Sequence, residues 1–208
     1  MFGILVFGDS IAFGRGESPS IGWSGRLKTH FEKGGFHNAS FDLSVPGDSS
    51  TTLLKRFETE LSARIKYIYP GDKFIVMIAV GINDCRGVGS LNKLQTKPGK
   101  FEKNISTLIQ IAKKYTKHVV IVGLTPVDEN KTNPFEDTYF TNNRVQEYDV
   151  ILQHCARAAK IGHVNLFELI SECNYKKLLV DGVHPNKKGY EKMYKIIKEF
   201  LIKKKIIN

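Results

Sequence analysis

Short runs of apolar residues alternate along the chain with longer stretches in which apolar positions recur every three or four residues. The short runs are rich in β-branched and aromatic residues and end at Gly, Pro or Asp, as strands commonly do. This pattern predicts five strands, at residues 4–7, 40–45, 74–80, 119–124 and 163–167. The run at 74–80 is apolar without alternation, which is typical of a strand buried on both faces.

The longer stretches have the spacing of amphipathic helices. They predict five helices, at residues 23–32, 51–67, around 105–112, 145–159 and 187–204. Strands that alternate with helices indicate a parallel sheet with helices on both faces. The sequence contains no internal repeat and no Pro/Gly-rich linker. We therefore expect a single domain over residues 1–208, a three-layer α/β/α sandwich with a central five-stranded parallel sheet of the flavodoxin-like type.

Composition narrows the class of protein. Hydrophobic residues make up 41% of the 208 residues and charged residues 25%, which fits a globular domain and argues against disorder. The longest apolar stretch, 74–82, is far shorter than the ~20 residues of a membrane-spanning helix. Cys85, Cys155 and Cys173 have no C-x-x-C spacing and predict neither a zinc ribbon nor a disulfide framework. Because the N-terminus also lacks the basic region of a signal peptide, we expect a cytoplasmic protein.

Lysine and arginine outnumber aspartate and glutamate by 31 to 21, so the formal net charge is +10. Much of the excess lies on the last predicted helix and just beyond it, at Lys187, Lys188, Lys192, Lys195, Lys198, Lys203, Lys204 and Lys205. The simplest interpretation is a solvated helix face. The alternative is attraction to an anionic phospholipid surface. Nucleic-acid binding is not expected, because the sequence has no basic segment with interleaved aromatic residues.

Polar residues gather where the predicted strands end and just before the last helix. In a parallel sheet the strand ends meet at one edge, where open α/β sheets bind their ligands. The predicted loops at 86–100 and 126–143 are long enough to border such a site. Four blocks supply the polar residues: Gly8-Asp9-Ser10, Pro46-Gly47-Asp48-Ser49, Gly81-Ile82-Asn83-Asp84 and Asp181-Gly182-Val183-His184-Pro185. Serine, histidine and aspartate are the parts of a nucleophilic triad.

In content and order these four blocks resemble those of the GDSL, or SGNH, hydrolase family of esterases and lipases. The resemblance implies Ser10 as the nucleophile, His184 as its general base and Asp181 as the group that orients the imidazole. It also implies an oxyanion hole made by the backbone N–H groups of Ser10 and Gly47 and the side-chain amide of Asn83. An activated serine and preorganised donors to the oxyanion suit acyl transfer. No metal or cofactor is implied.

Several of these residues also have a structural interpretation. A lone serine after a strand usually caps a helix, but in the company of the other blocks we interpret Ser10 as catalytic. Asp9 and Asp84 are expected to bond local backbone N–H groups, and a glycine at 47 lets the backbone approach a substrate closely. Cys85 is expected to be a packed thiol. The remaining histidines lack metal-ligand spacing: His30, His37, His118, His154 and His163.

The predicted function is hydrolysis of carboxylic esters through an acyl-enzyme. Short acyl groups are favoured because the sequence shows no broad apolar lid. Some aromatic residues near the predicted rim could line a pocket or pack internally: Phe13, Trp23, Phe135, Tyr139 and Phe140. One alternative is a lysophospholipase or thioesterase that works at an anionic lipid surface, and another is a non-catalytic binding module. The expected partner is a small-molecule ester, and the sequence indicates no oligomeric state.

Overall fold

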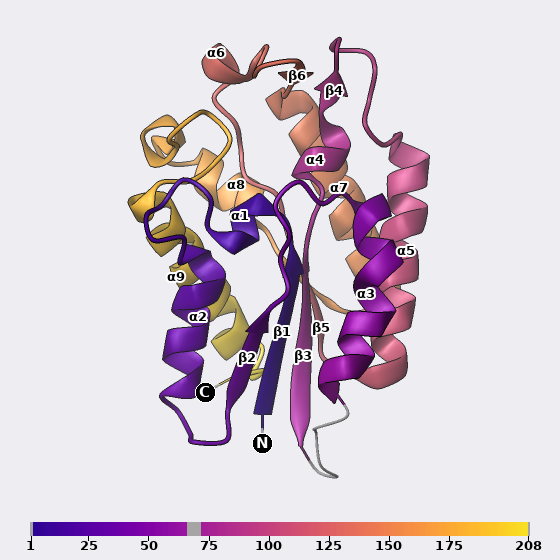
Figure 1. The fold of residues 1–208 in the computed structure, drawn as a ribbon, viewed down its shortest axis with the longest axis vertical. Helices are drawn as coiled ribbons and strands as arrows, with labels where there is room; N and C mark the ends of the chain where they lie inside the picture. Colours follow the sequence, from indigo (N-terminus) through magenta and orange to yellow (C-terminus); the bar gives the residue numbers. More distant parts are fainter. Residues whose placement is uncertain (1, 66–71, 208) are drawn as a thin grey trace.

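The computed structural model describes residues 2–65 and 72–207, and it places a sheet between two layers of helices (Figure 1). Within these residues the main sheet has five parallel strands, in the spatial order β2-β1-β3-β5-β7. They are β1 (Phe2–Gly8), β2 (Ala39–Asp42), β3 (Lys73–Ala79), β5 (Val119–Val122) and β7 (Gly162–Val164). This is the flavodoxin-like order, so the predicted α/β/α fold is confirmed.

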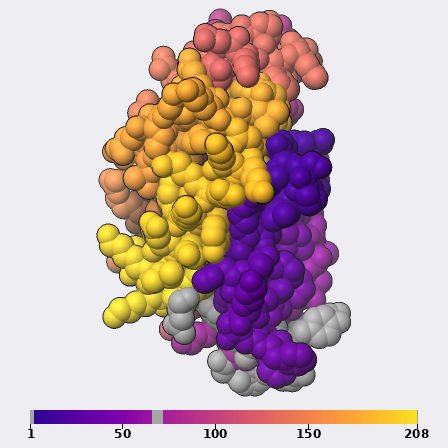
Figure 2. Space-filling view, turned by 90° about the vertical axis from the view of Figure 1, so that its left-hand side faces the viewer, coloured from indigo at the N-terminus to yellow at the C-terminus, as the bar shows by residue number. Residues whose placement is uncertain are grey.

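The helices cover both faces of the sheet. Helices α2 (Gly22–Glu32) and α9 (Lys187–Lys203) pack against each other on one face, and they lie side by side in Figure 2. Helix α5 (Pro98–Tyr115) packs between α3 (Ser50–Ile65) and α7 (Asn142–Ala159) on the other face. These are the five predicted helices, although predicted residues 66 and 67 lie outside the described residues. None of the helices in the described ranges is long and apolar enough to cross a membrane.

The core lies on both sides of the central strands. Strand β3 is buried from Phe74 to Ala79, as its unbroken apolar sequence predicts, and it pairs with β1 over seven residues. Burying a large aliphatic or aromatic side chain stabilises the fold by about 1.5–3 kcal/mol. The register sets Gly8 opposite Ala79, so the two strands end at the same level. Two of the four polar blocks therefore begin side by side.

Three predicted strands are shorter than expected. Strand β2 ends at Asp42, but the chain continues along β1, because Val45 N donates to the carbonyl of Gly8 at 3.0 Å. Strand β5 ends at Val122. The prediction for 163–167 is wrong in its second half, where helix α8 (Leu166–Ser171) begins. Asn165 ends the strand there because its side chain caps α8 by accepting from the backbone N–H of Glu168 at 3.3 Å.

The two long loops meet beyond the carboxyl ends of the strands. A short antiparallel pair joins them, made of β4 (Gly87–Val88) and β6 (Thr138–Tyr139). The one-turn helix α6 (Glu129–Thr132) precedes β6, and all three elements lie at the top of Figure 1. The loops therefore form a wall above the edge of the sheet at which the four polar blocks lie.

Candidate active site

Ser10 lies where β1 turns into the one-turn helix α1 (Ser10–Phe13). Its neighbour Asp9 caps this helix, because the Asp9 side chain accepts a hydrogen bond from Ile11 N at 2.9 Å. Gly8 permits the close turn, since a Cβ there would lie 2.4 Å from the Cβ of Ala12. The capping role considered for Ser10 thus belongs to Asp9, and the Ser10 hydroxyl is available to another partner.

That partner is His184, and three side chains form a continuous hydrogen-bonded row. Ser10 Oγ lies 2.9 Å from His184 Nε2, and His184 Nδ1 lies 2.7 Å from Asp181 Oδ2. The contact with the carboxylate favours a proton on Nδ1, which leaves Nε2 as the acceptor for the Ser10 hydroxyl. The structure therefore brings together the three residues to which the sequence assigned the roles of nucleophile, base and orienting carboxylate.

Asp181 is held in place by its own turn as well as by His184. Its Oδ1 accepts the backbone N–H groups of Val183 at 2.9 Å and His184 at 2.8 Å. Burial alone would raise the pKa of Asp181, but the hydrogen bonds from the His184 ring and these two N–H groups hold that pKa well below its usual range. The carboxylate is thus ionised at neutral pH and fixes the orientation of the ring.

Asn83 and Gly47 lie beside this row. Asn83 belongs to the one-turn helix α4 (Ile82–Cys85), which begins where β3 ends, and its buried side chain donates from Nδ2 to the carbonyl of Asp48 at 3.0 Å. One N–H of the same amide is left for another acceptor. Gly47 has a φ of +90°, and apart from its two chain neighbours no residue of the described ranges has an atom within 4 Å of the position a Cβ would take. The left-handed backbone, and not crowding by the protein, therefore requires glycine there.

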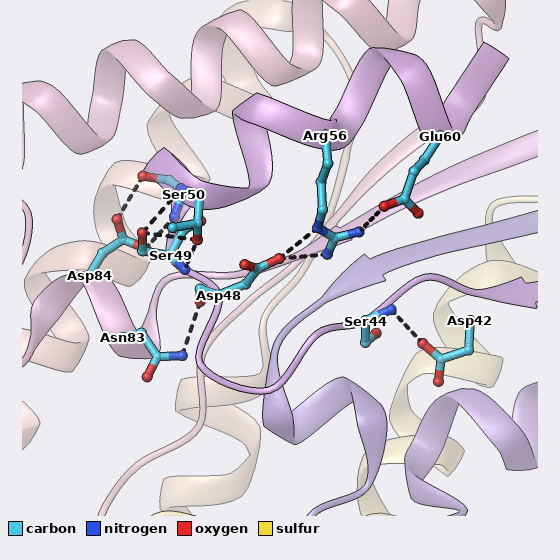
Figure 3. Close-up of polar contacts among 10 residues, drawn as sticks. Asp42, Ser44, Asp48, Ser49, Ser50, Arg56, Glu60, Asn83 and Asp84 are labelled. Atoms are coloured by element: carbon cyan, nitrogen blue, oxygen red, sulfur yellow. Dashed lines mark hydrogen bonds and ion pairs between the residues drawn. The ribbon is translucent and has the colours of Figure 1, made fainter. Parts of the chain in front are cut away.

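Besides the bond from Asn83, polar contacts of Arg56 and Asp84 hold the segment from Gly47 to Ser50 (Figure 3). The carboxylate of Asp48 accepts from Arg56 Nε at 2.9 Å and from Arg56 Nη2 at 2.6 Å. Asp84 accepts from the backbone N–H of Ser50 at 2.8 Å and from its hydroxyl at 2.6 Å. The segment is therefore fixed to α3 through Arg56 and to α4 through Asp84.

The structural role expected of Asp84 is found: its carboxylate accepts from its own backbone N–H group and also from Ser50, 34 residues away. Burial raises the pKa of Asp84, against the effect of the hydrogen bonds from Ser50. Asn104 of α5 completes the cluster by donating to the hydroxyl of Ser50 at 2.9 Å. No sequence motif predicts these partners, Arg56, Ser50 and Asn104. Asn104 could have been noticed, because it is a polar residue on the apolar face of its helix.

A cleft of about 580 Å³ opens beside Ser10. Its walls come from all four polar blocks and from both long loops, as the sequence predicts for the loops. The cleft is lined by Ser10, Arg15, Pro46, Gly47, Ile82, Asn83, Arg86, Val88, Phe135, Glu136, Asp137, Thr138, Phe140, Asp181, Val183 and His184. Of the five aromatic residues considered for the rim, Phe135 and Phe140 line this cleft, whereas Trp23 is buried in the core. Phe13 and Tyr139 do not line it.

Two further titratable groups lie buried next to the site. Burial raises the pKa of the Asp9 carboxyl to about 7. Burial also raises the pKa of Cys85, a fully buried thiol that donates to the carbonyl of Ile82 at 3.3 Å, as expected of a packed cysteine. Among the residues that the structure describes, no three His, Cys, Asp or Glu side chains are grouped to hold a metal ion.

Comparisons with known proteins place this geometry in context. The sequence model of the GDSL-like Lipase/Acylhydrolase family matches residues 6–192. No curated protein sequence matches the chain. Solved structures share the fold: a lipase/acylhydrolase from Enterococcus faecalis has a TM-score of 0.74 at 21% identity, over 97% of this chain and 95% of that one. The esterase EstA from Pseudoalteromonas sp. has a TM-score of 0.71 at 19% identity, over 99% of both chains.

A third similar structure is a mutant of an acetylxylan esterase from Geobacillus stearothermophilus. Its TM-score is 0.73 at 15% identity, and the match covers 96% of this chain and 93% of that one. At these identities the likeness concerns the fold.

Proposed function

Since the chain belongs to the GDSL-like lipase/acylhydrolase family and is a hydrolase of ester bonds, we propose that it cleaves short-acyl carboxylic esters through Ser10, His184 and Asp181. The observation that carries this proposal is the hydrogen-bonded row from Ser10 Oγ through the His184 ring to the Asp181 carboxylate, at 2.9 and 2.7 Å. The row ends in a cleft that is open to a substrate. A nucleophile that lines the cleft and already contacts its base needs no rearrangement before it reacts.

In the first half of the reaction, Ser10 Oγ attacks the carbonyl carbon of the ester while His184 Nε2 takes the hydroxyl proton. The tetrahedral intermediate collapses, the bond to the alcohol oxygen breaks, and His184 returns the proton to the leaving alcohol. In the second half, a water molecule attacks the acyl-enzyme with His184 again as the base, which releases the carboxylic acid and regenerates Ser10. Asp181 stabilises the protonated ring in both halves.

We assign the oxyanion hole to three donors. The backbone N–H groups of Ser10 and Gly47 have no hydrogen-bond acceptor among the described residues, so both can donate to a substrate. The amide of Asn83 uses one N–H for Asp48 and has a second to offer. Such preorganised donors stabilise the negative charge that develops on the carbonyl oxygen, each by about 2.7–4 kcal/mol.

The preference for short acyl groups rests on the character of the cleft. Most of its lining residues are polar or charged, and only Phe135 and Phe140 supply aromatic surface. A long alkyl chain gains binding energy from apolar area, about 25 cal/mol per Å², and this lining offers little of it. The acetylxylan esterase among the similar structures is consistent with an acetyl substrate.

A series of p-nitrophenyl esters from acetate to dodecanoate tests the proposal. We expect kcat/KM to be highest for acetate or butyrate and to fall as the acyl chain lengthens. A maximum at ten or more carbons would contradict the short-acyl assignment while leaving ester hydrolysis in place. The absence of turnover for every ester, in a folded protein, would favour a binding module on this fold.

The lysine-rich helix supports a second candidate, a lysophospholipase or thioesterase at an anionic lipid surface. Helix α9 begins next to His184, but its 17 residues extend about 25 Å along the side of the sheet. Lys203, Lys204 and Lys205 therefore lie far from the cleft. Activity on anionic micelles that falls steeply as salt is added would favour this candidate over the first.

A further inference from the structure

We propose that the cleft selects esters that carry a second, anionic group, a carboxylate or a phosphate, and that Arg86 binds this group with the help of Arg15. The inference rests on the proposed function, because it names the class of ester that the same site would take. The observation behind it is that two arginines line the cleft and have no role in the proposed reaction.

Arg86 is a half-buried cation whose side chain has no hydrogen-bond or ion-pair partner among the residues that the structure describes. It directly follows α4 and is three residues beyond Asn83, so its backbone is fixed close to the oxyanion donors. Its Nε is buried and makes no hydrogen bond, and its guanidinium has no ion pair with any residue of the described ranges. A buried polar group left unsatisfied costs about 1–3 kcal/mol, and more when it is charged.

Other arginines of this protein that approach the interior are paired. Arg26 contacts the carboxylate of Glu17 at 2.5 and 2.7 Å, and Arg56 contacts those of Asp48 and Glu60. Arg144 donates to the carbonyl of Leu91. Arg86 differs from these arginines in that it lines the cleft and is unpaired in the described part of the chain. An anionic group on a substrate would supply the acceptor that it lacks.

Arg15 brings a second guanidinium from another part of the chain. It follows α1, and its carbonyl accepts a hydrogen bond from the Tyr190 hydroxyl at 2.6 Å, which holds the backbone in place. The next residue, Gly16, packs so closely on His184 that a Cβ there would lie 3.1 Å from the Cβ of the histidine. The Arg15 side chain is exposed and has no hydrogen bond or ion pair to any residue in the described ranges.

Besides Asp181, which is paired with His184, two carboxylates line the cleft, Glu136 and Asp137, and they oppose an anionic ligand. Both are exposed, and neither forms an ion pair with Arg15 or Arg86. Water and salt screen exposed charges, whereas a half-buried guanidinium is screened much less. We therefore expect Arg86, more than Glu136 and Asp137, to determine whether the cleft prefers anionic or neutral esters. A planar guanidinium binds carboxylate or phosphate through two parallel N–H groups, and a lysine cannot reproduce that geometry.

Two pairs of matched esters test the inference and separate the two sources of charge. In the first pair, mono-p-nitrophenyl succinate carries a carboxylate on the acyl side, and its methyl ester is neutral. In the second, acetylglycerol phosphate carries a phosphate on the alcohol side, and acetylglycerol is neutral. For at least one pair we expect the wild type to favour the anionic ester by roughly 10- to 100-fold in kcat/KM.

Three variants identify the group responsible. Arg86→Gln should abolish most of the preference, chiefly through a higher KM for the anionic ester, and Arg86→Lys should restore part of it. Arg157→Gln removes an exposed arginine on α7, far from the cleft walls, and should keep the wild-type preference. Should Arg86→Gln fail to fold, folded Arg86→Lys provides the test, because it keeps the charge but loses the two parallel N–H groups, and it should therefore retain only part of the wild-type preference.

A preference that survives in folded Arg86→Gln would overturn the inference. So would equal rates on the charged and neutral esters in the wild type, and in that case the proposed ester hydrolysis would stand. A wild type that hydrolyses none of the four esters would overturn the proposed function, and this inference with it.

Discussion

The side-chain amide of Asn83 donates to the main-chain carbonyl of Asp48 across 3.0 Å. This single bond connects the turn after β3 with the loop after β2, and it sets the direction in which the remaining N–H of the amide points. Gly47 directly precedes Asp48 in the same loop. The bond between Asn83 and Asp48 therefore fixes the relative position of two of the three proposed oxyanion donors, Asn83 and Gly47. The orientation of the Asn83 amide thus depends on Asp48, which does not line the cleft.

The first prediction concerns Asn83 itself. Asn83→Ala should lower kcat by about 10²–10³ while leaving the fold intact, because only one donor to the oxyanion is removed. The measurement is steady-state turnover of p-nitrophenyl acetate, with circular dichroism as the check on folding. Full activity in a folded variant would exclude Asn83 from the oxyanion hole.

Arg56 should behave as a positioning residue. Its contacts with Asp48 hold the loop that bears Gly47, and Asp48 is buried, so Arg56→Ala should destabilise the protein by about 3–5 kcal/mol and reduce kcat. Arg56→Lys should recover part of both losses, and Arg64→Ala on the same helix serves as the control. Urea unfolding gives the stability, and turnover gives kcat and KM separately. If kcat in folded Arg56→Ala equals that of the wild type, the loop does not need this support.

Asp181 should matter for the tautomer of His184 more than for the fold. Asp181→Asn keeps an oxygen to accept the backbone N–H groups of Val183 and His184, but it no longer stabilises the protonated ring. We expect kcat to fall by about 10⁴. Thermal unfolding at neutral pH should change far less than activity does, and an active variant would contradict the assignment.

The raised pKa of Asp9 predicts that the free energy of unfolding depends on pH. Its pKa is about 7 in the folded state against 3.8 for a free side chain, so between these pH values the folded protein keeps a proton that the unfolded chain has lost. The stability that this group contributes is present below pH ~4 and is lost as the pH rises to about 7. Asp9→Asn cannot ionise, yet it can still accept from Ile11 N.

The unfolding free energy of Asp9→Asn should therefore fall less between pH 5 and pH 8 than that of the wild type. Urea titrations of both proteins at four pH values measure the difference. Parallel pH profiles would show that the Asp9 carboxyl has no such linkage to folding.

The sequence predicts the layers of this fold and the convergence of Ser10, His184 and Asp181, for physical reasons that particular residues make clear. The unbroken apolar run of β3, rich in β-branched residues, predicts a strand buried on both faces, and the structure confirms it. Ser10 and His184 are 174 residues apart. Ser10 lies just after β1, and His184 lies just before α9, which packs beside the sheet, so the topology brings both to the same edge. The short motifs that contain Ser10 and His184 are what mark these two residues as candidates for the site.

What the sequence does not predict depends on contacts between distant segments. The pairing of β4 with β6 joins two loops that have no strand pattern of their own. Trp23, considered for the rim, is buried in the core instead. The partnership of Ser50 with Asp84 is equally invisible, because neither residue's neighbours indicate which polar group will lie opposite once the chain has folded.

Covalent labelling of the nucleophile tests the central claim most directly. Wild type and Ser10→Ala would be incubated with a fluorophosphonate probe, the adduct would be located by peptide mass spectrometry, and p-nitrophenyl acetate turnover would be recorded on the same samples. The account predicts one adduct, on Ser10, with both labelling and turnover lost in a folded Ser10→Ala. An adduct on another residue, or turnover that persists without Ser10, would contradict it.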